Sequence, residues 1–159
     1  GGQPPPSSQR MTERPILTEV KPQWVDHYGH MNLAYYLVVF DMACDVQWLD
    51  LGFGPEYRAR GMGTFAAESW QAYIREVREG APLACESVVL DFDDKRLLCR
   101  HMMYHAKEGW QVAENEVLYL SIDLTKRRVA PWPEDILARL AARRSGETAK
   151  RLSLKSPKR

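Results

Sequence analysis

An acid, a base and an amide lie within seven positions of one another in the stretch WVDHYGHMN. They are Asp26, His30 and Asn32. Gly29 lies among them, and the long apolar run 33–51 follows at once. The first N–H groups of a helix have no backbone acceptor, and the aligned peptide dipoles place a partial positive charge there. An oxyanion would be stabilised at that point, so a neighbouring carboxylate would suit cleavage of an acyl bond.

The element that must position this chemistry is the run LAYYLVVFDMACDVQWLDL, residues 33–51, which contains no Gly or Pro. Its first two turns are apolar almost all round, which is typical of a helix enclosed by other structure. Asn32 is placed to cap the helix, and Gly52 is placed to end it. Asp26 precedes the cap by six residues. Gly29 permits the tight backbone that would bring the acid back to the helix start.

Four strand-like runs follow the helix, separated by polar turn signals, and we expect them to be joined by hairpins. They are residues 64–74, 84–92, 96–106 and 110–123. A short strand near residues 16–22 and a final helix from Pro133 complete the set. Strands joined by hairpins make an antiparallel sheet, and its concave face must cover the apolar helix. The predicted class is therefore α+β, with a curved antiparallel sheet around one long central helix.

The composition favours a single domain of 159 residues. We predict a flexible leader over residues 1–12, the domain over 13–140, and a flexible tail over 141–159. That tail carries a net charge of +6, against −5 for the rest of the chain; a solvated terminus explains it better than a nucleic-acid contact. Three cysteines without a C-x-x-C pair argue against disulfides and a thiolate metal site, and favour a reducing cytoplasm. No stretch is long and apolar enough to span a membrane.

The pattern D-x-x-G-H-x-N-x-A-x-Y ahead of an apolar helix resembles the hotdog-fold acyl-CoA thioesterases of the 4-hydroxybenzoyl-CoA thioesterase-like family. The likeness runs from about residue 17 to about residue 133 and includes the GAPL turn at 80–83. Within that family the sequence is most similar to thioesterases of carnitine breakdown, which act on betainyl-CoA. WVDHYGHMN, YIREVREGAPL and MYHAKEGW carry this closer likeness.

The resemblance implies that Asp26 is the catalytic carboxylate, acting as a nucleophile or as a general base that activates water. Backbone N–H groups at Asn32 and Leu33 would polarise the thioester carbonyl. It also implies a homodimer or homotetramer, acyl-CoA as the substrate, and no metal or other cofactor. The residues that we expect to contact the substrate are Gly29, His30, Tyr36 and Glu68.

Two other functions fit the same pattern. In a hotdog hydratase or dehydratase, His30 instead of Asp26 would carry the proton chemistry. In a non-catalytic acyl-CoA-binding module, the fold would bind the ester without releasing a thiol. A turn-forming role for Asp26, bonded to its own backbone, is the plain structural alternative to catalysis.

Several other polar residues have structural explanations. His101 and His105 are four apart on a predicted strand, about 13 Å, which is too far to share a metal ion. Edge-strand or interface positions would explain Glu114 and Glu116. The aromatic residues near Asp26 suit a core, but several ring faces would also hold a quaternary ammonium acyl group. Basic residues near strand ends could meet the phosphates of CoA: Arg75, Arg78, Lys95, Arg96 and Lys107.

Overall fold

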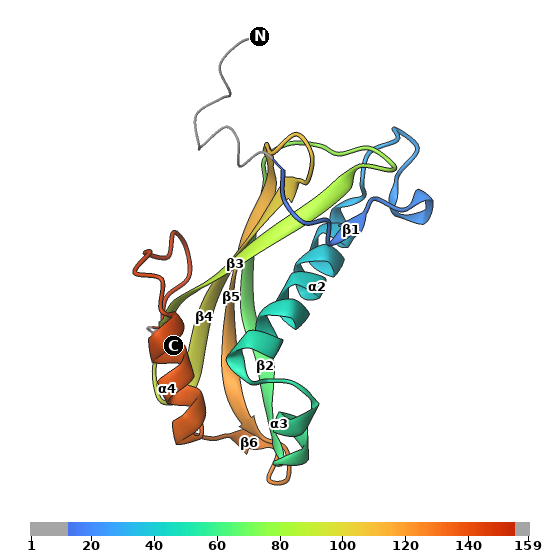
Figure 1. Cartoon of the computed structure of the whole chain (residues 1–159). Helices are drawn as coiled ribbons and strands as arrows, with labels where there is room; N and C mark the ends of the chain where they lie inside the picture. Colours follow the sequence, from blue (N-terminus) through green and yellow to red (C-terminus); the bar gives the residue numbers. More distant parts are fainter. Residues whose placement is uncertain (1–12, 155–159) are drawn as a thin grey trace. The chain divides into compact units, whose positions relative to one another are not determined.

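The computed structural model describes residues 13–154 and confirms the α+β class. The predicted leader, residues 1–12, lies outside the described residues. Figure 1 shows the elements, a long helix and a sheet with short additions. In chain order they are β1 (Thr18–Glu19), the 3-10 turn η1 (Pro22–Trp24), α2 (Leu33–Leu51), α3 (Pro55–Ala59), β2 (Met62–Tyr73), β3 (Pro82–Phe92), β4 (Arg96–His105), β5 (Gln111–Asp123), β6 (Arg128–Val129) and α4 (Glu134–Arg143).

The strand order differs from a simple series of hairpins. The sheet has the order β1-β3-β4-β5-β2, and β6 pairs with β5. Strand β2 therefore pairs with β5 and not with β3, the next strand along the chain. The connection 74–81 joins two strands that are not neighbours in the sheet, so the prediction of a hairpin there is wrong. Periodicity finds each strand, but partner choice depends on contacts far apart in sequence.

The chain divides into two compact units, each with its own core. The first contains residues 1–43, 72–86 and 102–114. In its core, Val39 and Phe40 of α2 are buried together with Met103 and Val112 of the sheet strands. Tyr36, Val39 and Phe40 lie on one face of the helix, at the i, i+3, i+4 spacing. This unit holds the polar stretch around Asp26.

The second unit contains residues 44–71, 87–101 and 115–159. Its core joins Cys44 and Leu51 of α2 to alternating residues of β4 and β5. The rings of Trp48 and Tyr119 meet edge-on, with centroids 4.6 Å apart. Helix α4 contributes Ile136 and Leu140, which are four residues apart and fully buried on one face. Alternation along the strands thus separates a helix-facing side from an opposite side.

Only one face of α2 is covered within the described chain. In the first unit, Leu33, Leu37 and Val38 are exposed by 62%, 43% and 40%. In the second unit, Val46 and Leu49 are exposed by 60% and 68%. The prediction that the helix is enclosed on all sides is therefore not met by one copy of the chain. These exposed apolar side chains are neighbours along one helix and are not scattered single residues.

The opposite side of the second unit is covered by residues 145–154, here called the C-terminal strap. The backbone N–H of Ser145 donates to the Val89 carbonyl at 2.9 Å. Farther along, Leu152 and Leu154 pack against Leu90, Leu98 and Leu118. The prediction of a flexible tail is therefore wrong for residues 141–154, and the remainder lies outside the described residues. In the second unit, β5 is therefore buried on both sides, which explains its continuous burial from residue 115 to 119.

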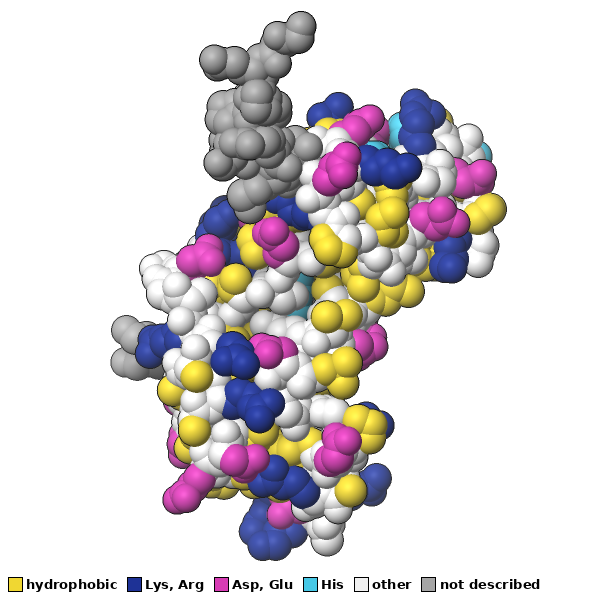
Figure 2. Space-filling view, viewed as in Figure 1, with side chains coloured by type: hydrophobic (Ala, Val, Ile, Leu, Met, Phe, Trp, Pro, Cys, Tyr) yellow, Lys and Arg dark blue, Asp and Glu magenta, His cyan; other side chains and the backbone are white. Residues whose placement is uncertain are grey.

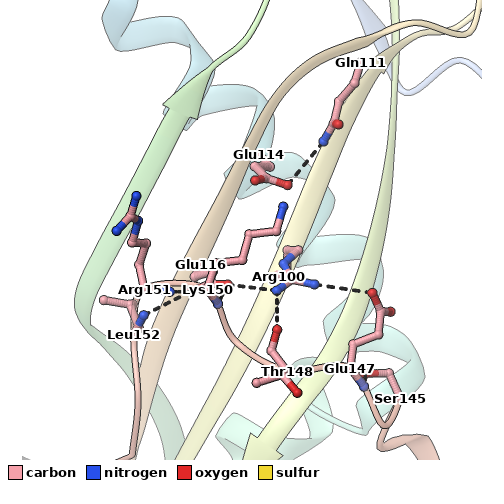
Figure 3. Close-up of polar contacts among 10 residues, drawn as sticks. All are labelled: Arg100, Gln111, Glu114, Glu116, Ser145, Glu147, Thr148, Lys150, Arg151 and Leu152. Atoms are coloured by element: carbon pink, nitrogen blue, oxygen red, sulfur yellow. Dashed lines mark hydrogen bonds and ion pairs between the residues drawn. The ribbon is translucent and has the colours of Figure 1, made fainter.

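One buried carboxylate holds the strap (Figure 3). Glu116 of β5 accepts the backbone N–H groups of Lys150, Arg151 and Leu152 at 2.7, 2.8 and 3.0 Å. It also pairs with Nη2 of Arg100 at 3.0 Å, and its own side chain is fully buried. Because β5 lies between β4 and β2, the predicted edge-strand role for Glu116 is wrong. A buried charge requires this many partners.

Charged side chains of both signs lie on the face of the described chain that Figure 2 draws. Among the described residues, no helix is long and apolar enough to cross a membrane. Figure 2 shows Lys and Arg side chains interspersed with Asp and Glu side chains on that face. Some charged side chains of the second unit form ion pairs between elements, such as Arg60 with Asp135 and Arg143 with Asp50.

Candidate active site

The stretch ahead of α2 folds into a closed loop in the first unit. Val25 and Met31 form an antiparallel bridge at its base. The N–H of Asp26 donates to the His30 carbonyl at 2.9 Å, and the N–H of Gly29 donates to the Asp26 carbonyl at 3.0 Å. Gly29 has φ +80°, the left-handed conformation that a residue without Cβ adopts most readily. The predicted tight return at Gly29 is therefore present.

The two carboxylate oxygens of Asp26 have different environments. Oδ1 accepts the backbone N–H groups of Tyr28 at 2.9 Å and His30 at 3.2 Å, forming an Asx turn. Within the described residues, no hydrogen bond or ion pair to Oδ2 is present. Asp26 is also only half-buried. One oxygen therefore shapes the loop and the other remains available to a substrate or a water molecule.

The start of α2 leaves one backbone donor unused. Asn32 caps the helix as predicted: its Oδ1 accepts the N–H of Ala34 at 3.1 Å. The N–H of Tyr35 donates to the Asn32 carbonyl at 3.0 Å. In the part of the chain that the structure describes, the N–H of Leu33 has no acceptor. This N–H lies at the electropositive end of the helix and can bind a carbonyl oxygen or an oxyanion.

Two residues that follow β2 complete the surroundings of the loop. Nδ1 of His30 lies 3.3 Å from Oε2 of Glu76. The backbones of His30 and Arg78 form an antiparallel bridge, and the N–H of Met31 donates to the Val77 carbonyl at 2.9 Å. The loop is therefore fixed to the segment 75–78. Sequence reasoning missed the role of Glu76, because nothing in the local pattern links residues 46 positions apart.

Tyr36 and Glu68 lie outside this loop. Tyr36 is 5% exposed and its ring meets that of Tyr73 edge-on, with centroids 5.0 Å apart. Burial, followed by the nearby Glu76 carboxylate, raises the pKa of Tyr36, so its hydroxyl stays neutral. Glu68 belongs to the second unit and is exposed on β2. Substrate contact by either residue stays a prediction.

Aromatic rings lie beside the start of the helix. Trp24 and Tyr35 are stacked, with ring centroids 5.5 Å apart and planes inclined by 16°. Tyr28, in the loop itself, is 76% exposed. The loop and the start of the helix therefore carry both a buried stack and an exposed ring. Contact of these rings with a substrate stays a prediction.

A histidine of the second unit forms a polar chain inside the core. His101 is fully buried, and its Nδ1 lies 2.6 Å from Oγ of Ser87. Its Nε2 lies 3.3 Å from the hydroxyl of Tyr119, which donates to Sγ of Cys44. Because the Tyr119 proton is used in that bond, Nε2 must donate, and Nδ1 must accept from Ser87. His101 is thus a buried strand residue whose two ring nitrogens both have hydrogen-bond partners.

Comparison with known proteins identifies the fold and the family. The model of the thioesterase-like superfamily matches residues 20–140. A betainyl-CoA thioesterase from Pseudomonas aeruginosa is 36% identical over 126 residues, which cover 79% of this chain and 79% of that protein. An L-carnitine dehydrogenase/betainyl-CoA thioesterase from Agrobacterium fabrum is 33% identical over 74% of this chain, which spans only 24% of that longer protein.

A solved structure from Staphylococcus aureus, in complex with CoA, superposes with a TM-score of 0.74 at 21% identity. The match covers 91% of this chain and 98% of that one. This likeness confirms the predicted hotdog fold, with an antiparallel sheet packed on a long helix. Since the family model matches well over half of the sequence and the curated relatives are named thioesterases, the chain belongs to the thioesterase-like superfamily and is a thioester hydrolase.

Proposed function

We propose that the protein hydrolyses an acyl-CoA, with betainyl-CoA as the preferred ester, and that Asp26 carries the reaction. The observation that supports this most directly is that only one of the two carboxylate oxygens of Asp26 is used within the loop. Oδ1 is held by two backbone N–H groups, which fix the position of the carboxylate without using Oδ2. A fixed carboxylate with one oxygen available is suited to act as a general base or a nucleophile.

The chemistry follows from the loop and the start of the helix. The thioester carbonyl oxygen binds the N–H of Leu33, which stabilises the negative charge that develops there. Oδ2 of Asp26 either removes a proton from an attacking water or attacks the carbonyl carbon itself. The C–S bond then breaks, and the thiolate leaves and takes up a proton. Where Oδ2 attacks directly, the acyl group remains on Asp26 as a mixed anhydride, which a water molecule hydrolyses to release the acid and restore the carboxylate. Water and thioester are converted into a carboxylic acid and CoA, and the reaction needs no cofactor.

The two rival functions require different residues. In a hydratase or dehydratase, His30 would move the proton. Its Nδ1 lies against the Glu76 carboxylate, which suits a residue that holds the loop in place. A non-catalytic module would require neither an unused backbone N–H at Leu33 nor an unused carboxylate oxygen at Asp26. We therefore favour hydrolysis.

The preference for betainyl-CoA rests on the curated relatives and on the rings beside the helix start. A trimethylammonium group gains about 0.5–2 kcal/mol from each ring face that it contacts. Trp24 and Tyr28 are each two positions from Asp26 in the sequence. Tyr35, which stacks on Trp24, lies in the first turn of α2. Contact with two faces would contribute about 1–4 kcal/mol and would favour the cationic ester at least about fivefold over an uncharged ester of the same shape.

We also propose that the protein acts as a homodimer or a larger homo-oligomer. Each unit exposes apolar side chains of α2, among them Leu37 and Val46, which water would otherwise solvate. A second copy of the chain is the partner that we expect on this surface. Sedimentation of the native protein as a monomer at micromolar concentration would contradict this assignment.

The test is an acyl-CoA panel with detection of the free thiol, run on the native protein and on Asp26→Asn. The asparagine keeps a side-chain oxygen for the Tyr28 and His30 N–H groups, so the loop and the fold should persist. We expect hydrolysis to fall at least about 100-fold. Asp94→Asn, which changes an exposed acid in the turn between β3 and β4, is the matched control and should retain activity.

The outcomes separate the candidates. Near-native turnover by Asp26→Asn would refute the catalytic role, and binding without thiol release by the native protein would identify the non-catalytic module. For the acyl group, the comparison is betainyl-CoA against its neutral isostere, 3,3-dimethylbutanoyl-CoA. Equal or higher kcat/KM on the neutral ester would remove the proposed preference for the cation.

A further inference from the structure

A cavity of about 250 Å³ in the first unit lies beside the loop that holds Asp26. Its walls are the segment 75–78, which is bonded to that loop, and the turn between β4 and β5. The side chains that carry charge or rings into its lining are Arg75, Glu76, Arg78, His105 and Trp110. Neither the acid nor the helix start of the proposed active site forms part of it.

One wall of the cavity is a stack of flat groups. The guanidinium of Arg75 lies 4.1 Å from the centre of the Trp110 ring. The imidazole of His105 lies against the same indole, with centroids 5.0 Å apart. Guanidinium and indole planes are surfaces on which a purine stacks, with a gain of about 1–3 kcal/mol per base. The stacking also restrains Arg75, which lowers the entropic cost of binding a ligand there.

A second guanidinium joins the cavity to the active-site loop. A Cβ placed on Gly29 would lie 3.7 Å from Nη1 of Arg78. The side chain of Arg78 therefore lies against the open side of the Asp26 loop, and its backbone pairs with His30. A ligand that is bound to Arg78 is thus held next to the loop that would act on a thioester.

Arg75 and Arg78 have no carboxylate partner in the part of the chain that the structure describes. Six other arginines do form ion pairs with Asp or Glu, for example Arg14 with Glu86 and Arg144 with Asp91. The one carboxylate in the lining, Glu76, lies against His30 instead. Two unpaired guanidinium groups facing one carboxylate leave the cavity with a positive balance, which suits phosphate.

His105 adds a hydrogen-bond donor. The backbone N–H of Glu108 donates to Nδ1 of His105 at 3.0 Å. Nδ1 therefore carries a lone pair, and the ring proton is on Nε2. The imidazole thus presents an N–H group that can donate to a phosphate oxygen or to a purine nitrogen.

We infer that this cavity binds the phosphorylated adenosine end of the CoA ester, with Arg78 and Arg75 on the phosphates and the Arg75–Trp110 stack against the purine. This inference rests on the proposed function, because it assumes that a CoA ester is the substrate. It assigns to the cavity the discrimination between a CoA ester and the same acyl group on a shorter thiol.

The kinetic test uses one acyl group on two thiols, CoA and pantetheine, the second of which lacks the nucleotide. Arg75→Gln and Arg78→Gln each remove one charged donor and keep the length of the side chain. We expect each variant to raise the KM for the acyl-CoA about tenfold, with kcat within twofold of native. On the acyl-pantetheine, kcat/KM should stay within twofold of native.

The matched control is Arg58→Gln, which removes an exposed arginine of α3, without an ion-pair partner among the described residues. It should leave both substrates unchanged. An unchanged KM for acyl-CoA in both cavity variants overturns the inference. So does an equal loss on the two thioesters, because that loss would come from the active-site loop and not from nucleotide binding.

A binding measurement keeps this inference separate from the proposed function. Adenosine 3′-phosphate 5′-diphosphate is titrated into the full chain by calorimetry, with inorganic phosphate as the second ligand. We expect the nucleotide to bind more tightly than phosphate, and Arg78→Gln to weaken it about tenfold. Equal affinity for both ligands would identify a plain anion site and overturn the nucleotide assignment. If no thioester is hydrolysed but the nucleotide binds in this way, the proposed function fails and the cavity assignment stands.

Discussion

Replacing Glu116 by glutamine tests whether one buried carboxylate holds the C-terminal strap. Oε1 accepts the N–H groups of Arg151 and Leu152, and Oε2 accepts the N–H of Lys150 and Nη2 of Arg100. A glutamine of the same size has only one acceptor oxygen. In either orientation its NH₂ group faces two donors, so two N–H groups lose their acceptor.

The expected cost follows from this geometry. Each buried donor that loses its acceptor costs about 1–3 kcal/mol, so the two together cost about 2–6 kcal/mol. Arg100 keeps the Thr148 carbonyl and the Glu147 carboxylate as partners. The strap can instead detach and let water reach these groups, so its own docking energy sets the upper limit. At 3 kcal/mol, opening of the strap becomes roughly a hundredfold more frequent.

Two measurements check this prediction. Urea unfolding gives the change in the free energy of unfolding, and amide hydrogen exchange reports directly on residues 150–152. The control is Glu147→Gln, which removes the other carboxylate on Arg100, at 3.3 Å and with a side chain that is 50% exposed. An exposed pair contributes below about 1 kcal/mol, so this variant should keep the strap protected.

The reasoning would be refuted if Glu116→Gln unfolded within about 1 kcal/mol of native and residues 150–152 stayed as protected as before. Acid titration offers an internal check. Burial alone would raise the pKa of Glu116, but the three backbone N–H groups and Arg100 outweigh it and hold the pKa below its ordinary value of 4.5. The stabilisation is therefore complete above about pH 4.5 and is lost as the pH falls through the lower folded value. The glutamine variant should lack this acid-induced release.

Two further predictions concern the core and the loop. Burial lowers the pKa of His101 to about 4, against an ordinary value of 6.5. Between these two pKa values the unfolded chain binds a proton that the folded chain does not. The free energy of unfolding should therefore fall by about 3 kcal/mol from pH 7 to pH 4. A urea midpoint that stays constant over that range would contradict a buried, neutral histidine. Gly29→Ala places a Cβ in a left-handed conformation at φ +80°, without a close contact, and should cost about 1–2 kcal/mol in thermal unfolding while Asp26→Asn costs much less.

The helix and the loop ahead of it could be predicted from the sequence because their interactions are local. The run 33–51 carries its own signals: no Gly or Pro inside it, Asn32 as the cap and Gly52 after its end. The structure places α2 at Leu33–Leu51. The Asx turn at Asp26 likewise uses only atoms within four residues of one another. Interactions of such short range are encoded by residue type and spacing.

The surroundings of the loop could not be predicted in the same way. Glu76 lies against His30, and Arg78 lies against Gly29. Both contacts exist only because the connection after β2 runs back along the loop. Strand β2 in turn pairs with β5. The expected hairpin between β2 and β3 failed for the same reason. Local turn signals give no information about which of several suitable strands becomes the partner.

The C-terminal strap shows most clearly what the sequence determines and what only the tertiary structure decides. By itself, the sequence determined that residues 141–159 are basic, and their charge suggested a solvated tail. Only the tertiary structure decided that residues 150–152 bind Glu116, 34 to 36 positions earlier in the chain. The groups that make this contact are backbone N–H groups, which nearly every residue possesses. Composition therefore cannot identify them, and their use depends on a buried carboxylate that the folded sheet places within reach.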